Sequence, residues 1–346
     1  MFGYRVGMRP VLLVPGGTGQ LGRELVALAP PGTGVRAPGH AELDLTDGGA
    51  VAAAVAGFAA DARAEGRCPI VVNAAAYTAV DAAETDAAAA FAVNARGPAL
   101  LAAACAAHDV PLLHVSTDAV FAGDASRPYE VDDPAGPASV YGRSKLAGER
   151  AVLESAAAAW VIRTSWVYGA HGENFVRAML RLAAGDAELS VVDDQCAAPT
   201  WSADLAAGLL ELAARVAGGT PPRGVVLHCT GGGGTSRFAL ARAVFEELGA
   251  DPRRVRPCTT AEFPRPAPRP AYSVLSRASW RAAGLTPPRH WRRALSAAVP
   301  AIASGEAADR RAMGSKPTSA SRGNRGRSEA ANAYSKKTLP SPADSV

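Results

Sequence analysis

The sequence lacks a long apolar run, and this absence bears on where the protein works. No run approaches the ~18 residues of a membrane-spanning helix, because Asp, Glu, Arg and Gly interrupt the alanine-rich stretches. The first ten residues, MFGYRVGMRP, are not followed by the apolar segment and small-residue cleavage site of a secretory signal. We therefore expect a cytoplasmic protein with no membrane partner.

Metal-binding patterns are also missing. The five cysteines are scattered and never form a C-x-x-C pair, which favours reduced thiols that fill the core. The six histidines form neither an H-x-x-x-H pair nor a cluster with cysteine. The sequence therefore predicts no bound structural metal.

Net charge is absent from most of the chain. The formal charge is +4, but residues 301–346 carry eight Lys/Arg against four Asp/Glu, which leaves residues 1–300 neutral. This last segment is rich in Ser, Gly, Lys and Arg and poor in large apolar side chains, a composition typical of disorder. We expect a disordered basic tail over 301–346 and no nucleic-acid partner.

Short apolar runs alternate with helical stretches along the rest of the chain, a pattern typical of a parallel sheet buried on both faces. The sequence predicts an α/β fold: a Rossmann-type, doubly wound parallel sheet with a smaller C-terminal lobe. We expect an extension over 1–10, a Rossmann domain over 11–165 whose sheet is completed by about 224–230, and a lobe that takes most of 166–300. The expected strands are 11–15, 33–37, 70–76, 111–118, 160–169 and 224–230, with helices at about 47–60 and 84–108.

Glycines stand at the first strand-to-helix turn. Gly16, Gly19 and Gly22 follow the run VLLVP and precede a helical stretch, so they permit a tight turn and a close approach of the backbone to a pyrophosphate. No acidic residue closes the second strand, GVRAPGH, where an NAD-binding protein usually has one for the ribose hydroxyls. Arg36 and His40 lie there instead, which favours NADPH and leaves NADH open.

A Y-x-x-x-K pair is the main catalytic candidate. Tyr141 and Lys145 in SVYGRSKLAGE are four residues apart, so on a helix they share one face. A phenol beside an ammonium is a proton donor next to a charge that tunes it. The alternative is a chance pair, with the tyrosine half-buried and the lysine solvated.

Longer strings carry a resemblance to a known family. The glycine spacing and the Y-x-x-x-K pair resemble those of the extended short-chain dehydrogenase/reductase superfamily. Collinear strings over roughly residues 10–300 look like the dTDP-4-dehydrorhamnose reductase family: GGTGQLGREL, VVNAAAYTAVDAAE, AVNARGPALLA, HVSTDAVFAG, SVYGRSKLAGE, RTSWVYG, ENFVRAML, VVDDQCAAPT and RPAYSVL.

The resemblance implies an enzyme in which NADPH reduces the C4 ketone of dTDP-4-dehydro-β-L-rhamnose to dTDP-L-rhamnose. Tyr141 would protonate the new alkoxide, Lys145 would bind the nicotinamide ribose and lower the pKa of the phenol, and Thr117 would contact the sugar oxygen. The implied substrate contacts also include Val80, Asp118 and Trp166. Cofactor contacts would come from Gly16, Gly19, Gln20, Leu21, Gly22, Asp44, Leu45, Ala76, Tyr77, Thr78, Tyr141 and Lys145.

Two of these assignments have structural alternatives, and the sequence leaves the oligomeric state open. Asp44 would otherwise be an acid at a helix N-terminus, and Trp166 a filler of the core. The resemblance is compatible with a homodimer. Glu24 matches one position of a magnesium-dependent dimer in some relatives, but no other such position can be placed, so Mg²⁺ is not expected.

The chain departs from the family pattern twice. Ala119 replaces the aromatic residue after S-T-D, and Ala197 replaces a glycine, where a positive φ would be strained. One rival reading is another nucleotide-sugar enzyme of the epimerase or 4,6-dehydratase type; the dehydratases use Thr-Asp-Glu, whose second carboxylate Ala119 cannot supply. The other rival is a non-catalytic NADP-binding subunit, since the regulatory β subunit of methionine adenosyltransferase resembles the same family.

Overall fold

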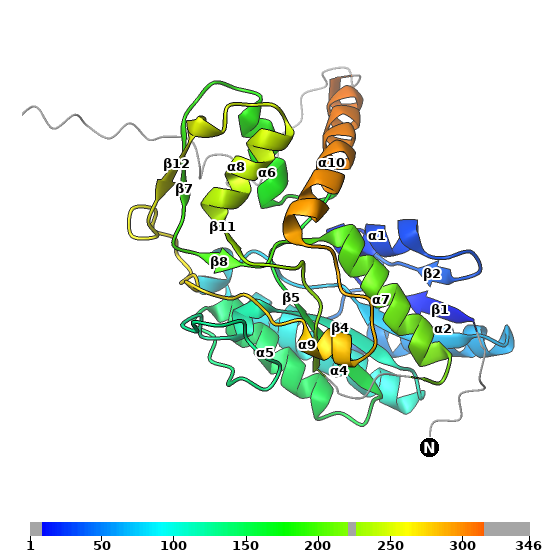
Figure 1. The fold of residues 1–346 in the computed structure, drawn as a ribbon. Helices are drawn as coiled ribbons and strands as arrows, with labels where there is room; N and C mark the ends of the chain where they lie inside the picture. The colour runs from blue at the N-terminus through cyan, green and yellow to red at the C-terminus, as the bar shows by residue number, and fades with distance from the viewer. Residues whose placement is uncertain (1–8, 221–225, 315–346) are drawn as a thin grey trace, which may run out of the picture.

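A six-stranded parallel sheet forms the centre of the protein in the computed structural model, which describes residues 9–220 and 226–314 (Figure 1). The strand order is β10-β5-β4-β3-β1-β2, so the direction of strand addition reverses between β1 and β3. The predicted Rossmann-type fold is confirmed. The strands are β1 (Pro10–Leu13), β2 (Gly34–Arg36), β3 (Cys68–Asn73), β4 (Leu112–Thr117), β5 (Ala159–Thr164) and β10 (Val226–His228).

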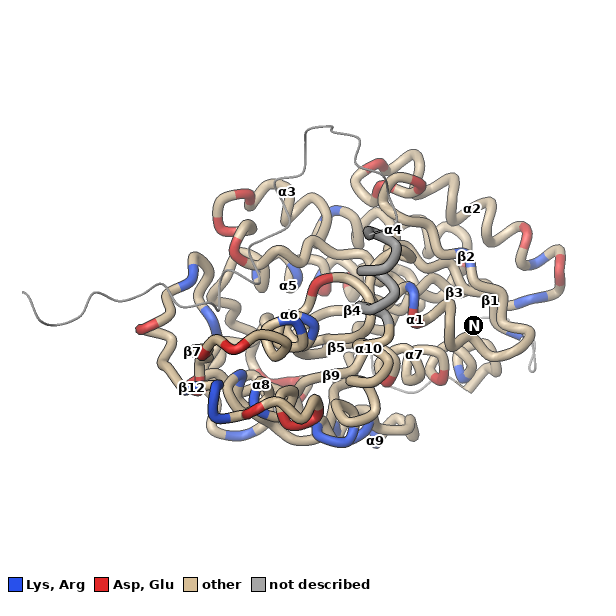
Figure 2. Tube along the Cα trace, turned by 90° about the horizontal axis from the view of Figure 1, so that it is seen from above, with Lys and Arg blue, Asp and Glu red and all other residues tan. Residues whose placement is uncertain are grey.

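Helices cover both faces of this sheet. Figures 1 and 2 show α1 and α7 side by side on one face, with α2, α4 and α5 on the other. Every residue of β3 and β5 is buried, because apolar helices pack on both sides of these strands. The covering helices are α1 (Gln20–Leu28), α2 (Gly48–Ala64), α3 (Ala87–Phe91), α4 (Gly97–Ala107), α5 (Val140–Leu153), α7 (Ser202–Ala217) and α9 (Ala278–Ala282).

The stretch Ala87–Ala107 is long and apolar enough to cross a membrane, judged by length and composition only. In the fold it comprises α3, a π-helical turn (Ala92–Arg96) and α4. Leu101, Ala102 and Cys105 are fully buried in the core that this segment forms with α2 and the sheet. Its apolar character therefore has an explanation within an α/β domain, in which such helices face the sheet.

A smaller lobe with its own hydrophobic core lies beyond the carboxyl ends of the strands. Its main elements are α6 (Phe175–Ala183), α8 (Arg237–Glu247) and α10 (Trp291–Gly314), with the parallel pair β7 (Leu189–Val192) and β12 (Val255–Cys258). The short strands are β6 (Val167–Tyr168), β8 (Cys196–Ala197), β9 (Thr200–Trp201) and β11 (Thr235–Ser236); single turns of 3-10 helix lie at Ala82–Glu84, Asp118–Val120 and Pro252–Arg254.

Parts of the range 166–300 belong to the sheet domain instead. Leu205 and Leu209 of α7 and Trp280 of α9 are fully buried against the sheet together with α1. The reason is topological: β10 lies parallel to β5, and a parallel neighbour needs a crossover, which α7 provides.

The C-terminal boundary also differs from the expectation. Residues 301–314 continue α10, and Ile302 is fully buried in the core of the smaller lobe. The expected disordered tail therefore does not begin at residue 301. Its remainder, residues 315–346, lies outside the described residues.

Candidate active site

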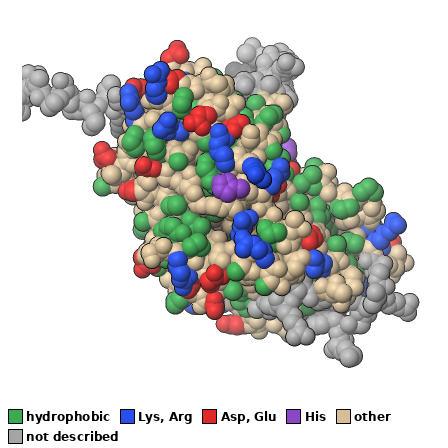
Figure 3. All heavy atoms as spheres, viewed as in Figure 1, with side chains coloured by type: hydrophobic (Ala, Val, Ile, Leu, Met, Phe, Trp, Pro, Cys, Tyr) green, Lys and Arg blue, Asp and Glu red, His purple; other side chains and the backbone are tan. Residues whose placement is uncertain are grey.

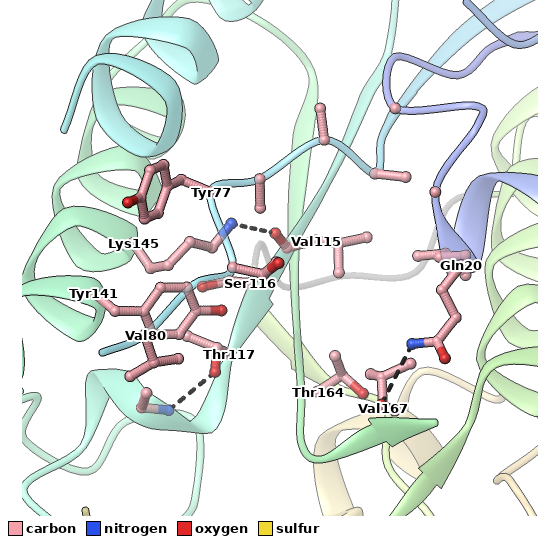
Figure 4. Close-up of a pocket in the computed structure, with 18 of the residues that line it drawn as sticks. Gln20, Tyr77, Val80, Val115, Ser116, Thr117, Tyr141, Lys145, Thr164 and Val167 are labelled. Atoms are coloured by element: carbon pink, nitrogen blue, oxygen red, sulfur yellow. Dashed lines mark hydrogen bonds between the residues drawn. The ribbon is translucent and has the colours of Figure 1, made fainter. Parts of the chain in front are cut away.

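A pocket of about 900 Å³ opens at the carboxyl ends of the central strands, next to the reversal between β1 and β3. Ligands of open α/β sheets bind at this kind of position. The residues that the sequence assigned to cofactor, substrate or chemistry line this pocket, except Gly22 and Arg36. Figure 4 shows Tyr141 and Lys145 projecting from α5 toward the strand that carries Val115, Ser116 and Thr117.

The glycine-rich turn forms one wall of the pocket. Gly16 has a φ of +82°, and a Cβ there would lie 2.7 Å from the backbone nitrogen of Ala75. A Cβ on Gly22 would lie 2.5 Å from the Gly16 oxygen, so Gly22 serves the close packing of α1 on the turn and does not face the pocket. No side chain caps the α1 N-terminus at Gly19. The first amides of this helix are thus available to an anion, and the turn fits a pyrophosphate.

The side of the pocket beyond β2 holds Asp44 and Leu45. The Asp44 carboxylate accepts hydrogen bonds from the backbone nitrogen and hydroxyl of Thr46, both at 2.8 Å, and these lower the pKa of Asp44. The alternative role for Asp44 as a helix cap is wrong, since Asp47 caps α2 by accepting bonds from Gly49 and Ala50.

Arg36 does not line the pocket. Its Nη1 is 2.9 Å from Asp61 Oδ2 on α2, so the salt bridge directs this guanidinium to the outer face of the domain. His40 does line the pocket. The Arg23 guanidinium also lies near this part of the pocket, because its Nε donates to the carbonyl of the lining residue Thr18 at 3.1 Å.

The segment Ala76, Tyr77 and Thr78 after β3 is held in place by Asn94, which the sequence analysis missed. Asn94 Oδ1 accepts a bond from the Tyr77 backbone nitrogen at 2.8 Å, and its Nδ2 donates to the Tyr77 carbonyl and to Ser144 Oγ, both at 3.0 Å. Asn94 lies in the π-helical turn and is 1% exposed. This one amide therefore fixes the cofactor segment against α5.

Lys145 is a buried cation. Its side chain belongs to a residue that is 2% exposed, and Nζ donates to the Val115 carbonyl at 2.8 Å. Burial lowers the pKa of Lys145 to about 8, while the nearby Glu149 carboxylate acts in the opposite direction. A solvated lysine in a chance Y-x-x-x-K pair is therefore ruled out.

Tyr141 is a neutral phenol at physiological pH. Burial raises the pKa of Tyr141 to about 12; a hydrogen bond with Thr117 lowers it, and the Asp118 charge raises it. The lowering of this pKa by Lys145 that the resemblance implies stays a prediction. The Lys145 ammonium donates a hydrogen bond to the Val115 carbonyl (Figure 4).

Thr117, Asp118, Trp166 and Val80 also line the pocket. Trp166 has a φ of +42°, a strained conformation for a tryptophan, and the Arg237 guanidinium lies 3.6 Å from the centre of its ring. The ring also packs against the core of the smaller lobe. The tryptophan therefore both faces the pocket and supports the lobe.

Several lining residues were assigned no role in the sequence analysis. Arg237 begins α8, and Pro268, Arg269 and Pro270 come from the proline-rich stretch FPRPAPRPAYS. Arg269 Nη2 is 2.9 Å from Asp81 Oδ1, which connects this stretch to the segment after β3. Only the fold brings these arginines to the pocket, more than 200 residues after the glycine-rich turn.

The two departures from the family pattern have different outcomes. Ala119 lines the pocket, so its small side chain leaves room there. The strain expected at Ala197 is wrong: this residue pairs with Thr235 in an antiparallel ladder and does not have a positive φ.

No group of three or more His, Cys, Asp or Glu side chains suited to a metal occurs among residues 9–220 and 226–314. Glu24 Oε1 accepts a hydrogen bond from Ser202 at 3.1 Å. This acid thus has a partner within its own chain.

Comparisons with known proteins agree with one another. The profile of the family described as RmlD substrate binding domain matches residues 8–304. A dTDP-4-dehydrorhamnose reductase of Streptomyces griseus is 52% identical over 85% of this chain and 94% of its own length. A probable dTDP-4,6-dihydroxy-2-methyloxan-3-one 4-ketoreductase of Streptomyces antibioticus is 49% identical over 85% of this chain and 96% of its own. The crystal structure of a dTDP-4-dehydrorhamnose reductase of Bacillus anthracis in complex with NADP superposes with a TM-score of 0.77 and 31% identity, covering 85% of this chain and all of that one.

Proposed function

Because the chain belongs to the RmlD substrate-binding family, whose curated members include dTDP-4-dehydrorhamnose reductases, we propose that it reduces the C4 ketone of dTDP-4-dehydro-β-L-rhamnose to dTDP-L-rhamnose. The chain is an NAD(P)H-dependent oxidoreductase, and the proposal names its substrate and the residues that act. The observation that carries it is the meeting of Tyr141, Lys145 and Thr117 at one pocket, next to the glycine-rich turn.

The residues present fit NADPH as the coenzyme. The turn from Gly16 to Leu21 and the uncapped start of α1 would hold the pyrophosphate, while Asp44 and Leu45 would contact the adenosine end. Lys145 and Tyr141 would bind the nicotinamide ribose. Bound NADPH supplies the hydride that reduces the ketone.

Tyr141 supplies the proton. A phenol with a pKa of about 12 is protonated throughout the physiological range, so it can give its proton to the oxygen on C4 as that oxygen gains charge. Thr117 stands beside this phenol, and the hydrogen bond between the two hydroxyls lowers the pKa of Tyr141. After transfer, Tyr141 is a phenolate, and the positive charge of Lys145 stabilises it until solvent returns the proton.

The substrate end of the pocket suits a nucleoside diphosphate sugar. Arg237 lines it and brings its guanidinium toward a substrate with two phosphate groups, while the lining residue Arg269 is paired with Asp81. Trp166 and Val80 offer apolar surface to the sugar. Ala119 faces this pocket where a dehydratase has its glutamate, so the chain offers no carboxylate for water elimination there.

A second ketone should be compared, because a relative from Streptomyces niveus, 42% identical over 84% of this chain, is named dTDP-4-keto-6-deoxy-D-glucose reductase, and the small side chain of Ala119 lines the pocket. Initial rates of NADPH oxidation should be measured with dTDP-4-dehydro-β-L-rhamnose and with dTDP-4-keto-6-deoxy-D-glucose, and the products identified by NMR. The proposal expects the L-sugar to give the higher kcat/KM. A higher value for the D-sugar would assign the chain to another 4-ketoreduction.

Coenzyme choice gives a first prediction. The end of the pocket near β2 has His40, the nearby guanidinium of Arg23 and no acid at the end of that strand, so a 2′-phosphate meets the positive charge of Arg23. We expect NADPH to bind more tightly than NADH, measured as two dissociation constants by quenching of tryptophan fluorescence. Arg36→Ala should leave the ratio of the constants unchanged, because Arg36 is paired with Asp61. A preference for NADH would contradict the prediction.

The pH dependence follows from Lys145. Burial holds the pKa of Lys145 at about 8, below that of a free lysine, so the cation is present at pH 7 and is lost as the pH rises through 8. We expect log(kcat/KM) for ketone reduction to be flat below this pKa and to fall with a slope of −1 above it. Tyr141 adds no second decrease near neutrality, since its pKa is about 12. A profile that is flat up to pH 10 would show that the Lys145 charge is not needed.

Ala119 gives a prediction about substrate fit. If the small side chain only leaves space, Ala119→Tyr should fold, keep its affinity for NADPH and lower the KM for the keto sugar, because a ring adds contact area. Steady-state kinetics with the L-sugar checks this. Loss of sugar binding with intact NADPH binding would mean that the pocket is shaped for a different ligand.

A further inference from the structure

The Asp118 carboxylate accepts hydrogen bonds from three hydroxyl groups on three separate segments. Thr117 Oγ1 donates to Oδ1 at 3.0 Å, while Ser165 Oγ and Ser273 Oγ donate to Oδ2 at 2.7 and 2.6 Å. All four side chains are buried, with Ser273 1% and Asp118 6% exposed. One carboxylate thus joins the end of β4, the end of β5 and a segment 155 residues further along the chain.

The segment around Ser273 is fixed from two sides. The Tyr272 nitrogen donates to the Gly123 carbonyl at 3.0 Å, in the stretch that follows β4. The Ser273 nitrogen donates to the Cys196 carbonyl at 2.8 Å, in β8 of the smaller lobe. Just before this point, Pro268, Arg269 and Pro270 line the substrate end of the pocket. The position of the Ser273 hydroxyl therefore depends on both parts of the protein.

Thr117 depends in turn on Asp118. A threonine hydroxyl has one proton, and here it is directed to Asp118, while the Ala119 backbone nitrogen donates to Thr117 Oγ1 at 3.2 Å. These two bonds set the rotamer of Thr117 and the direction of its remaining lone pair. The orientation of the hydroxyl beside Tyr141 is thus defined by a carboxylate that does not move freely.

We infer that Ser273 and Ser165 are positioning residues for the reduction. They fix the Asp118 carboxylate, which holds the Thr117 hydroxyl in position beside Tyr141. The same carboxylate connects Thr117 and Tyr141 to the segment that borders the substrate. Burial raises the pKa of Asp118 and the three hydroxyls lower it, so each hydroxyl also favours the charged carboxylate. The inference rests on the proposed ketone reduction for its readout. It assigns Asp118 an organising role in addition to the sugar contact expected from the sequence.

The test is a double-mutant cycle of Ser273→Ala and Asp118→Asn, with kcat measured for NADPH-dependent reduction of the L-keto sugar. Ser273→Ala alone should lower kcat about tenfold, a loss that corresponds to a coupling of about 1.4 kcal/mol. The dissociation constant of NADPH should stay within about twofold of wild type. With C4-deuterated NADPH, the kinetic isotope effect on kcat should rise, because the chemical step becomes slower. In the Asp118→Asn background, Ser273→Ala should have little further effect.

Ser202→Ala is the matched control, because it also removes a buried serine hydroxyl that donates to a carboxylate, that of Glu24, and lies outside the pocket. It should leave kcat and the isotope effect unchanged. Ser165→Ala repeats the test from another segment, the one that follows β5, should Ser273→Ala fail to bind NADPH. Equal losses from Ser273→Ala in both backgrounds, or no loss in wild type, would overturn the inference. Turnover of the ketone by the wild-type protein tests the proposed function separately.

Discussion

Tyr141→Phe is expected to lower kcat for ketone reduction by about 10²–10⁴-fold, the usual cost of losing a positioned general acid. The change keeps the ring, which packs beside Val140 and Ala83, and removes only the hydroxyl. The fold and the affinity for NADPH should therefore survive. Stopped-flow measurement of NADPH oxidation separates the chemical step from binding.

Tyr168→Phe is a suitable control for this variant. Tyr168 is 2% exposed, its hydroxyl is buried, and it lies on β6 outside the pocket. Removing this hydroxyl should leave the rate of reduction near that of wild type. A comparable loss in both variants would point to a general effect on packing and not to proton donation.

Lys145→Met is expected to have the second large effect, and one of a different kind. The change removes the buried cation that would bind the nicotinamide ribose and stabilise the Tyr141 phenolate. We expect NADPH to bind about 10- to 100-fold more weakly, as for the loss of a hydrogen bond to a charged group, and kcat to fall as well. Isothermal titration with NADPH and steady-state kinetics measure the two effects.

Arg150→Met, on the exposed side of the same helix, controls for the loss of a cation on α5 and should change neither quantity. The double variant Tyr141→Phe/Lys145→Met should lose less than the two single losses combined, because the two residues act as a unit. Full additivity would mean that the residues act independently.

Local features were sufficient to predict residues that line the pocket. The glycine turn and the Tyr141–Lys145 pair are read from spacing on one turn or one helix, and the residues after β3 follow from the resemblance to the family. The parallel sheet follows from the alternation of strands and helices, since consecutive strands joined by helical crossovers run in the same direction. The predicted Rossmann sheet was confirmed for this reason.

Features that depend on distant partners could not be predicted. Arg36 looked available for a 2′-phosphate, but its partner Asp61 lies on the next helix, and no spacing rule connects the two. Ser273 and Asn94 are ordinary polar residues in the sequence, and they acquire a role only through bonds to Asp118 and Tyr77. The lowered pKa of Lys145 could not be predicted either, because it follows from burial of the side chain and not from the Y-x-x-x-K spacing.

The central claim is that Tyr141 protonates a ketone reduced at this pocket, and a single-turnover experiment tests it most directly. The protein loaded with one equivalent of NADPH is mixed with dTDP-4-dehydro-β-L-rhamnose, the decay of the coenzyme absorbance is followed, and the product is identified by NMR. We expect the wild-type protein to consume the NADPH and form dTDP-L-rhamnose, while Tyr141→Phe with bound NADPH reacts about 10²–10⁴-fold more slowly. Equal rates for the two proteins, or a wild-type protein that leaves the ketone unreduced, would contradict the account.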